Sequence, residues 1–157
     1  MAKRTTRKGA DTLSPTGTKV HPQLKQNTCY CIVKVATRMR ARLDERLKAF
    51  SLIGPQYAML RLLSIEGRMT QIELGNFMAM DKATMVRMID GLEEREYVRR
   101  TLSDSDRRAK WLELTPAGKK ALSTLEGMRE AAETEFLAAL SPSEKKQLKE
   151  IMFKLLV

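Results

Sequence analysis

The stretch "MTQIELGNFMAMDKATMVRMIDGLEEREYV", Met69–Val98, predicts two helices separated by a very short connection. Thr70 can cap the first helix, because Glu73 stands three residues later and completes a capping box. That helix should end near Met78, and Asp81 can cap the second one. Two helices joined by so short a turn are typical of a helix-turn-helix unit.

The second of these helices has an apolar stripe, which should face the core. Its members recur at three- and four-residue steps: Met85, Met88, Ile89 and Leu92. The outward positions near its start are then Lys82, Thr84 and Arg87. Side chains of these types can contact base edges or phosphates in a DNA major groove. The alternative is an ordinary solvated helix face.

Two strands are predicted next, Tyr97–Leu102 and Lys110–Thr115, joined by the polar loop "SDSDRRA". Arg107, Arg108 and Lys110 would stand at the tip of this hairpin. An arginine there suits the narrow, electronegative minor groove, and Asp106 could brace a neighbouring guanidinium. The alternative is a tip that is charged only for solubility.

Helices are predicted on both sides of this unit. Apolar residues recur at helical spacing over Leu24–Phe50, and "SLIGPQYAMLRLLSIEG" gives a helix from about Pro55 to Ser64, with a break at Gly67. Pro116 opens a further helix, in which Gly118 and Gly127 are weak points. Its expected core positions are Leu122, Leu125, Met128, Ala132, Phe136 and Leu140. A last helix starts with Ser141 as cap, Pro142 at its first position and Glu144 as capping-box partner. The predicted fold is mainly α with a small β-hairpin, in the order of a winged helix.

The chain is strongly basic, with 29 Lys and Arg against 19 Asp and Glu, a net charge of +10. Such a charge favours an anionic partner, most often nucleic acid and less often a membrane surface. Residues 1–22 lack apolar periodicity and are expected to form a flexible basic arm, with one domain over 23–157. Without a long apolar run or a signal peptide, the chain is expected in the cytoplasm and away from membranes.

No catalytic constellation is evident in the sequence, so no enzyme is expected. The lone His21 falls in the basic arm, and glycine-rich phosphate loops are missing. Cys29 and Cys31 are too few for a structural zinc site, and no metal or cofactor is expected. The ten methionines could line an adaptable ligand pocket, or simply fill the core at helical spacing.

From about Leu24 to Val157 the chain resembles the MarR family of transcriptional regulators. "SDSDRRAKWLELTPAGKK" resembles the family's Asp-Arg-Arg wing with its Leu-x-Leu-Thr-x-x-Gly continuation. "MDKATMVRMIDGLEEREYVRR" resembles its recognition helix and helix exit. The resemblance implies a winged-helix homodimer on a pseudo-palindromic operator, usually a repressor, with its terminal helices as dimer interface. It also assigns Arg108 to the minor groove.

The resulting function is a dimeric DNA-binding repressor released by a small aromatic or organic ligand. The expected DNA-binding residues lie on the two helices and the wing: Thr70, Gln71, Lys82, Ala83, Thr84, Arg87, Asp106, Arg107, Arg108 and Lys110. Two alternatives stay open: a DNA-binding architectural protein without an effector, and a basic helical module that binds proteins.

One residue departs from the family pattern. Glu96 stands where the family usually has glycine, after the recognition helix. A left-handed backbone there would cost about 1 kcal/mol with glutamate instead of glycine. The helix exit, and with it the angle of the wing, could therefore differ.

The segment "LKQNTCYCIVKVATRM" resembles the start of organic-peroxide sensors of the OhrR type, whose reactive cysteine aligns with Cys29. A thiolate near a helix N-terminus is favoured by the helix dipole and can be oxidised. The tyrosines of that subgroup are missing, since Val33, Leu43 and Gly54 occupy their places. Cys29 is thus a redox candidate, or a small core residue.

Overall fold

The computed structural model describes residues 20–102 and 110–156. The chain divides into two units, Met1–Ala41 and Arg42–Val157. The first unit holds the 3-10 turn η1 (Pro22–Gln26) and the start of helix α1 (Thr28–Leu47). The second unit holds everything after residue 41.

The first long helix begins later than its apolar spacing predicted. Asn27 adopts an extended backbone after η1. Its side-chain oxygen accepts the Tyr30 N–H at 2.9 Å, and its carbonyl accepts the Cys31 N–H at 3.0 Å. Asn27 is therefore an N-cap, and residues from Leu24 to Gln26 belong to a separate turn. Pro22 already lies in that turn, where the flexible arm was predicted to end.

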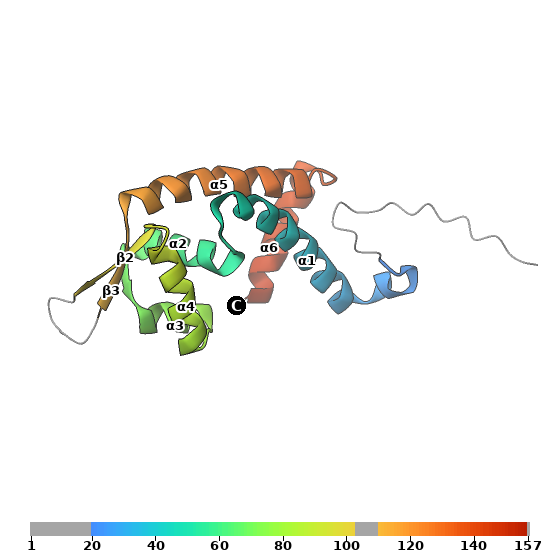
Figure 1. Ribbon diagram of the computed structural model, residues 1–157. Coiled ribbons are helices and arrows are strands. Elements are labelled where there is room, and N and C mark those ends of the chain that lie inside the picture. The colour runs from blue at the N-terminus through green and yellow to red at the C-terminus, as the bar shows by residue number, and fades with distance from the viewer. Residues whose placement is uncertain (1–19, 103–109, 157) are drawn as a thin grey trace, which may run out of the picture. The chain divides into compact units, whose positions relative to one another are not determined.

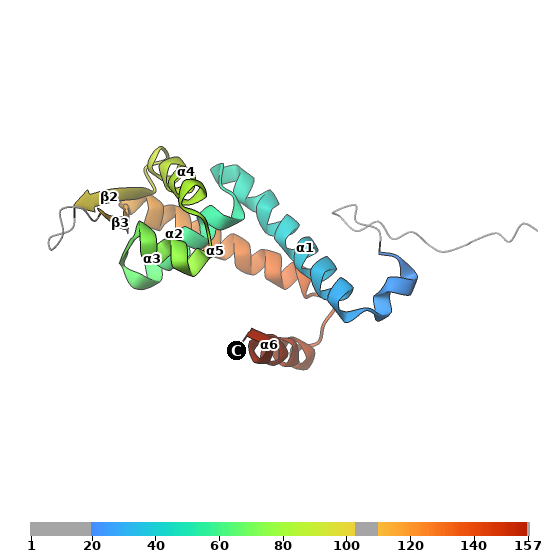
Figure 2. The ribbon, with the colours of Figure 1, turned by 90° about the horizontal axis from the view of Figure 1, so that it is seen from below.

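The second unit contains the predicted winged helix (Figure 1). After the end of α1 come the 3-10 turn η2 (Lys48–Phe50), α2 (Gly54–Glu66), β1 (Arg68–Thr70), α3 (Gln71–Met78), α4 (Lys82–Glu93), β2 (Val98–Leu102), β3 (Lys110–Leu114), α5 (Pro116–Phe136) and α6 (Pro142–Leu156). Both views place α2, α3 and α4 together beside the β2–β3 hairpin (Figures 1 and 2). The mainly α fold with a small hairpin is thus confirmed.

The sheet has a third strand that the sequence analysis missed. Its order is β1-β3-β2, and both pairings are antiparallel. Met69 pairs with Leu112 across the sheet, and both side chains are buried. Three residues are too short to show alternation, so only this pairing reveals β1 as a strand.

The core lies between the helices of the winged helix and the sheet. Its most buried large side chains come from α1 to α5 and β3: Leu47, Met59, Leu60, Leu63, Leu74, Met85, Ile89, Leu92, Leu112 and Leu125. Burial of Met59, Met69 and Met85 favours core filling over a methionine-lined ligand pocket for these residues. Among the predicted core positions, Met88, Met128, Phe136 and Leu140 are only half-buried.

The predicted helix caps are present. Thr70 Oγ1 accepts the Glu73 N–H at 3.2 Å, and Glu73 accepts the Thr70 N–H at 2.7 Å. These bonds from Thr70 lower the pKa of Glu73. Ser141 and Glu144 form the same reciprocal pair at the start of α6, and bonds from Ser141 likewise lower the pKa of Glu144. Short sequence motifs therefore determine where these two helices begin.

The departure at Glu96 leaves the family's backbone conformation in place. Glu96 keeps a left-handed backbone with φ 57°. The Tyr97 N–H donates to the Leu92 carbonyl at 3.0 Å, which closes the last turn of α4. Glutamate thus occupies a conformation that glycine would adopt more easily.

None of the helices in the described ranges is both long and apolar enough to cross a membrane.

Candidate nucleic-acid interface

Helix α4 is amphipathic, and its core-facing residues fix what it presents outward. Met85, Ile89 and Leu92 are each 1% exposed. Lys82 and Arg87, which were predicted to point outward, are exposed, whereas Thr84, predicted with them, is half-buried. Ala83, another of the expected DNA-binding residues, is exposed. The beginning of the helix therefore offers two cations and a methyl group to a partner.

A short chain of hydrogen bonds orders this outward face. Asp81 Oδ1 accepts the Thr84 N–H at 2.9 Å, which caps α4 as predicted. This backbone bond is the largest of the contacts that lower the pKa of Asp81. The Thr84 hydroxyl in turn accepts from Arg87 Nη2 at 3.1 Å. Thr84 thus orients a guanidinium on the exposed face as well as occupying it.

The other end of α4 is acidic, and two of its carboxylates share one arginine of the same chain. Asp90 Oδ1 accepts from Arg100 Nη2 at 2.7 Å, and Glu93 is ion-paired with Nη1 of the same arginine. Arg100 lies on β2, and its side chain is 22% exposed. Charge along α4 therefore runs from cationic at its beginning to anionic at its end. An anionic partner should meet the beginning of the helix.

Gln56 is a positioning residue that the sequence analysis missed. It is 7% exposed, and its side chain links two helices of the motif. Its Oε1 accepts the Ile53 N–H at 3.3 Å, and its Nε2 donates to the Met88 carbonyl on α4 at 3.3 Å. A polar residue inside an apolar stripe of α2 was the available signal.

Thr70 and Gln71 lie at the start of α3, and both are half-buried. The Thr70 hydroxyl donates to Glu73 Oε2 at 2.9 Å, so it already serves the helix cap. Beside them, the Arg68 guanidinium stacks on Trp111 with 4.7 Å to the ring centroid. This stack joins β1 to β3 at the base of the wing.

Only part of the predicted wing can be placed. Lys110 is exposed at the start of β3. Asp106, Arg107 and Arg108 lie outside the described residues. The strands that carry the loop are cross-linked by an ion pair from Arg99 Nη2 to Glu113 Oε2 at 3.0 Å.

The two cysteines lie in the first unit. Cys29 is the second residue of α1 and is exposed, so in this structure it does not fill a core. The Cys31 thiol donates to the Lys25 carbonyl at 3.2 Å. In the second unit, Leu43 is half-buried, and Gly54, which also replaces a tyrosine of the peroxide sensors, begins α2.

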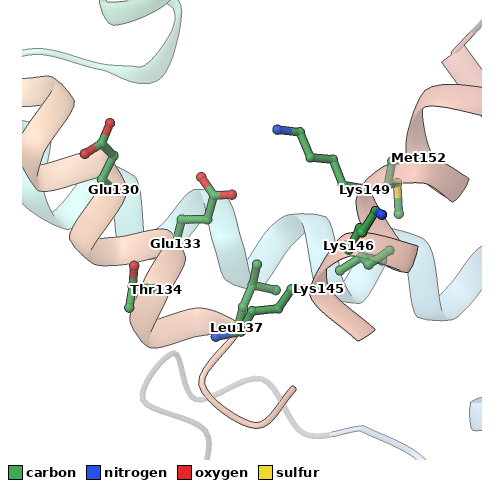
Figure 3. Close-up of a pocket in the computed structure, with 9 residues that line it drawn as sticks. Glu130, Glu133, Thr134, Leu137, Lys145, Lys146, Lys149 and Met152 are labelled. Carbon is green, nitrogen blue, oxygen red and sulfur yellow. The ribbon is translucent and has the colours of Figure 1, made fainter. Parts of the chain in front are cut away.

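A hollow lies between α5 and α6, with a volume of about 790 Å³ (Figure 3). Its α5 side carries Glu130, Glu133, Thr134 and Leu137, and its α6 side carries Lys145, Lys146, Leu148, Lys149 and Met152. Helix α6 has no buried residue. It leaves several apolar side chains 40–81% exposed: Ile151, Met152, Phe153, Leu155 and Leu156.

The geometry defines a winged helix with exposed cations at the beginning of α4. The MarR family model matches residues 54–110, which span α2 to the start of β3. A probable transcriptional regulator from Pseudomonas aeruginosa is 26% identical, with a TM-score of 0.74, over 84% of this chain and 98% of that one. Residues 54–110 of the chain therefore match the MarR family and form its winged helix.

More distant structures share the fold. A mutant MarR from E. coli complexed with operator DNA has a TM-score of 0.75 at 20% identity, over 88% of this chain and all of that one. AbsC, a MarR family regulator from Streptomyces coelicolor, has a TM-score of 0.72 at 23% identity, over 88% and 95% of the two chains.

Proposed function

We propose that the protein is a dimeric repressor that binds a pseudo-palindromic operator in the cytoplasm, and that a small organic ligand releases it. The observation that supports DNA binding is the beginning of α4, where Lys82, Ala83 and Arg87 are exposed. At the other end of the helix, Arg100 pairs with Asp90. A recognition helix contacts bases with its N-terminal residues, which is the cationic end here.

The proposed contacts to DNA are of two kinds, contacts to bases and contacts to the backbone. Arg87 suits the O6 and N7 atoms of a guanine, and Lys82 suits a guanine or a phosphate. Thr84 assists by orienting Arg87. Thr70, Gln71 and Lys110 are proposed to contact the backbone. In the wing, Arg107 and Arg108 are proposed to reach the minor groove, with Asp106 bracing a neighbouring guanidinium. Backbone contacts position the protein, and base contacts select the sequence.

The exposed apolar residues of α6 support the dimer. A soluble protein rarely leaves so many large apolar side chains bare on one helix without a partner for them. A second copy of the chain, meeting the terminal helices, would cover them. Two copies would then present two α4 helices to two half-sites.

The hollow between α5 and α6 is a candidate effector site. Its volume of about 790 Å³ is in the range of small-molecule pockets, and Lys145, Lys146 and Lys149 favour an organic anion. Because α6 is also a proposed dimer element, a ligand there would change the spacing of the two α4 helices.

The test is titration of duplex DNA from upstream of the protein's own gene at rising salt, beside a scrambled duplex. A repressor should keep its preference for one sequence as salt weakens both. Equal binding to both duplexes would indicate an architectural protein. Binding to neither would indicate a protein-interaction module. Arg108→Ala should weaken both and reduce the salt slope by about one unit.

A Cys29 oxidation switch is the second candidate, supported by the exposure of Cys29 at the start of α1. The test is operator binding before and after a stoichiometric organic hydroperoxide, for wild type and Cys29→Ser. Loss of binding in wild type alone would support a sulfenate or a mixed disulfide with a small thiol. Unchanged binding, with Cys29 still free by thiol titration, would exclude the switch.

A further inference from the structure

The outer face of α4 carries a hollow with a mainly apolar lining. Lys82, Ala83, Val86 and Arg87 surround it. Ala83 is exposed and Val86 is half-buried, so both can present methyl groups to an occupant. The two cations come from the same helix, five residues apart, at either side of these methyl groups. An occupant should therefore combine an apolar group with nearby negative charge.

In the major groove of DNA, one group of the bases is apolar and lies near the negative phosphates. Among the groups that the four bases show in the major groove, only the 5-methyl group of thymine is apolar. The phosphates on either side supply the negative charge that Lys82 and Arg87 favour. A polar base edge placed against Ala83 and Val86 would lose hydrogen bonds to water and gain none.

We propose that Ala83 and Val86 form a seat for the 5-methyl group of a thymine, and that Val86 is a specificity-determining residue of this regulator. The proposal rests on the proposed function, because α4 has to enter the major groove for the seat to be used. It adds the kind of base that the apolar part of the helix selects, beside the guanine or phosphate contacts of the cations.

The position of Val86 is stable enough to make this contact specific. Its neighbour Met85 is buried in the core, and Asp81 caps the helix one turn earlier. The Val86 side chain is β-branched, so it has one strongly preferred rotamer in a helix. A thymine methyl would therefore meet a surface of fixed shape.

The experiment starts from the duplex that wild-type protein selects most tightly out of a random library. Each thymine is then replaced singly by deoxyuridine, which removes the methyl group and keeps every hydrogen-bonding atom of the base. At one thymine in each half-site, wild-type binding should weaken about fourfold, the effect of burying one methyl group. At the same position, 5-methylcytosine should bind better than cytosine by a similar factor.

Val86→Ala gives the decisive comparison, because the ratio of thymine to deoxyuridine affinity is taken within one variant and any change in stability cancels. This ratio should fall to within about 1.5-fold in Val86→Ala. It should stay near fourfold in Ile65→Ala, which truncates another exposed apolar side chain of the same unit.

Three other outcomes would overturn the proposal in distinguishable ways. If wild type selects a sequence but no deoxyuridine weakens binding, Ala83 and Val86 do not contact a thymine methyl group, and the proposed function stands. If the fourfold ratio persists in Val86→Ala, the methyl group acts through DNA shape and Val86 does not read it. If wild type selects no sequence, the proposed function fails and the seat fails with it.

Discussion

Gly118 lies where α5 packs closely against the backbone of Tyr97, after the end of α4. A Cβ atom built there would come within 2.0 Å of the Tyr97 carbonyl oxygen, a backbone atom that cannot move aside. Gly127 lies on the same helix, and a Cβ atom there would meet nothing within 4 Å. Two glycines that look alike in the sequence therefore have different roles.

Gly118→Ala should destabilise the protein by more than about 2 kcal/mol, because α5 has to shift away from Tyr97. Gly127→Ala should instead stabilise it by up to about 1 kcal/mol, through better helix propensity. Urea unfolding of both variants measures the two changes. Similar effects in the two variants would argue against this close approach.

Tyr57 illustrates how a single hydroxyl joins two helices. It is 5% exposed on α2, and it donates to Glu126 Oε1 on α5 at 2.8 Å. Burial, followed by the hydrogen bond to Glu126, raises the pKa of Tyr57 to about 12. Burial alone would raise the pKa of Glu126, but bonds from Tyr57 and Arg129 and the charge of Arg61 lower it.

Tyr57→Phe should cost about 1 kcal/mol of unfolding free energy near neutral pH. The raised pKa favours the neutral phenol in the folded state. This contribution is complete below the unfolded pKa of 10.0 and is lost as pH rises towards about 12. Wild type should therefore lose more stability than Tyr57→Phe over that range. Parallel losses, measured by denaturant unfolding at each pH, would count against the hydrogen bond.

At the scale of elements, Arg100 links strand β2 of the wing to helix α4. Arg100 on β2 holds Asp90 and Glu93 on α4. The neighbouring Arg99 pairs with Glu113 on β3, but its side chain is 62% exposed. Arg100 is half-buried and pairs with two carboxylates, so it should contribute more than the single pair of the exposed Arg99.

Arg100→Ala should destabilise the protein by about 1–3 kcal/mol, because it leaves Asp90 and Glu93 without their partner. It should also weaken DNA binding, since the wing is no longer held at one angle to α4. Arg99→Ala is the matched control and should change stability by less than about 1 kcal/mol. Equal effects of the two substitutions on the urea midpoint would show that Arg100 does not stabilise the contact between β2 and α4.

The element order was predictable because each boundary depends on local chemistry. Thr70, Asp81 and Ser141 cap their helices as the sequence indicated, and the two wing strands begin and end within a residue of prediction. Strand β1 and the start of α1 were not predictable in this way. The first depends on pairing with a distant strand, and the second on a hydrogen bond from the backbone to Asn27.

The candidate site was predictable to a similar extent. Helical spacing was enough to place Lys82 and Arg87 on the outward face of α4, but Thr84, predicted there too, is half-buried. The contact of Arg87 with Thr84, the Gln56 link and the Arg100 bridge require side-chain positions that no spacing encodes. The assignments of Asp106, Arg107 and Arg108 stay predictions from the sequence.

At the scale of the whole molecule, the proposed dimer has a direct test. Light scattering of wild type at micromolar concentration should give about twice the chain mass of 17.9 kDa. Phe153→Glu places a charge on the exposed apolar face of α6 and should shift the mass towards one chain. Ile65→Glu adds the same charge on α2 and should leave the mass unchanged. A wild-type monomer that still binds an operator would contradict the dimer.

The central claim is that the beginning of α4 reads bases, and the most direct measurement is the sequence preference of Arg87→Ala. Binding to the selected duplex and to single-base variants is followed by fluorescence anisotropy at fixed salt. Arg87→Ala should lose about 1–3 kcal/mol of discrimination at one position per half-site. Lys48→Ala removes an equal charge outside the motif and should keep the wild-type preference. An unchanged base preference in Arg87→Ala, with affinity lowered equally for all duplexes, would contradict the account.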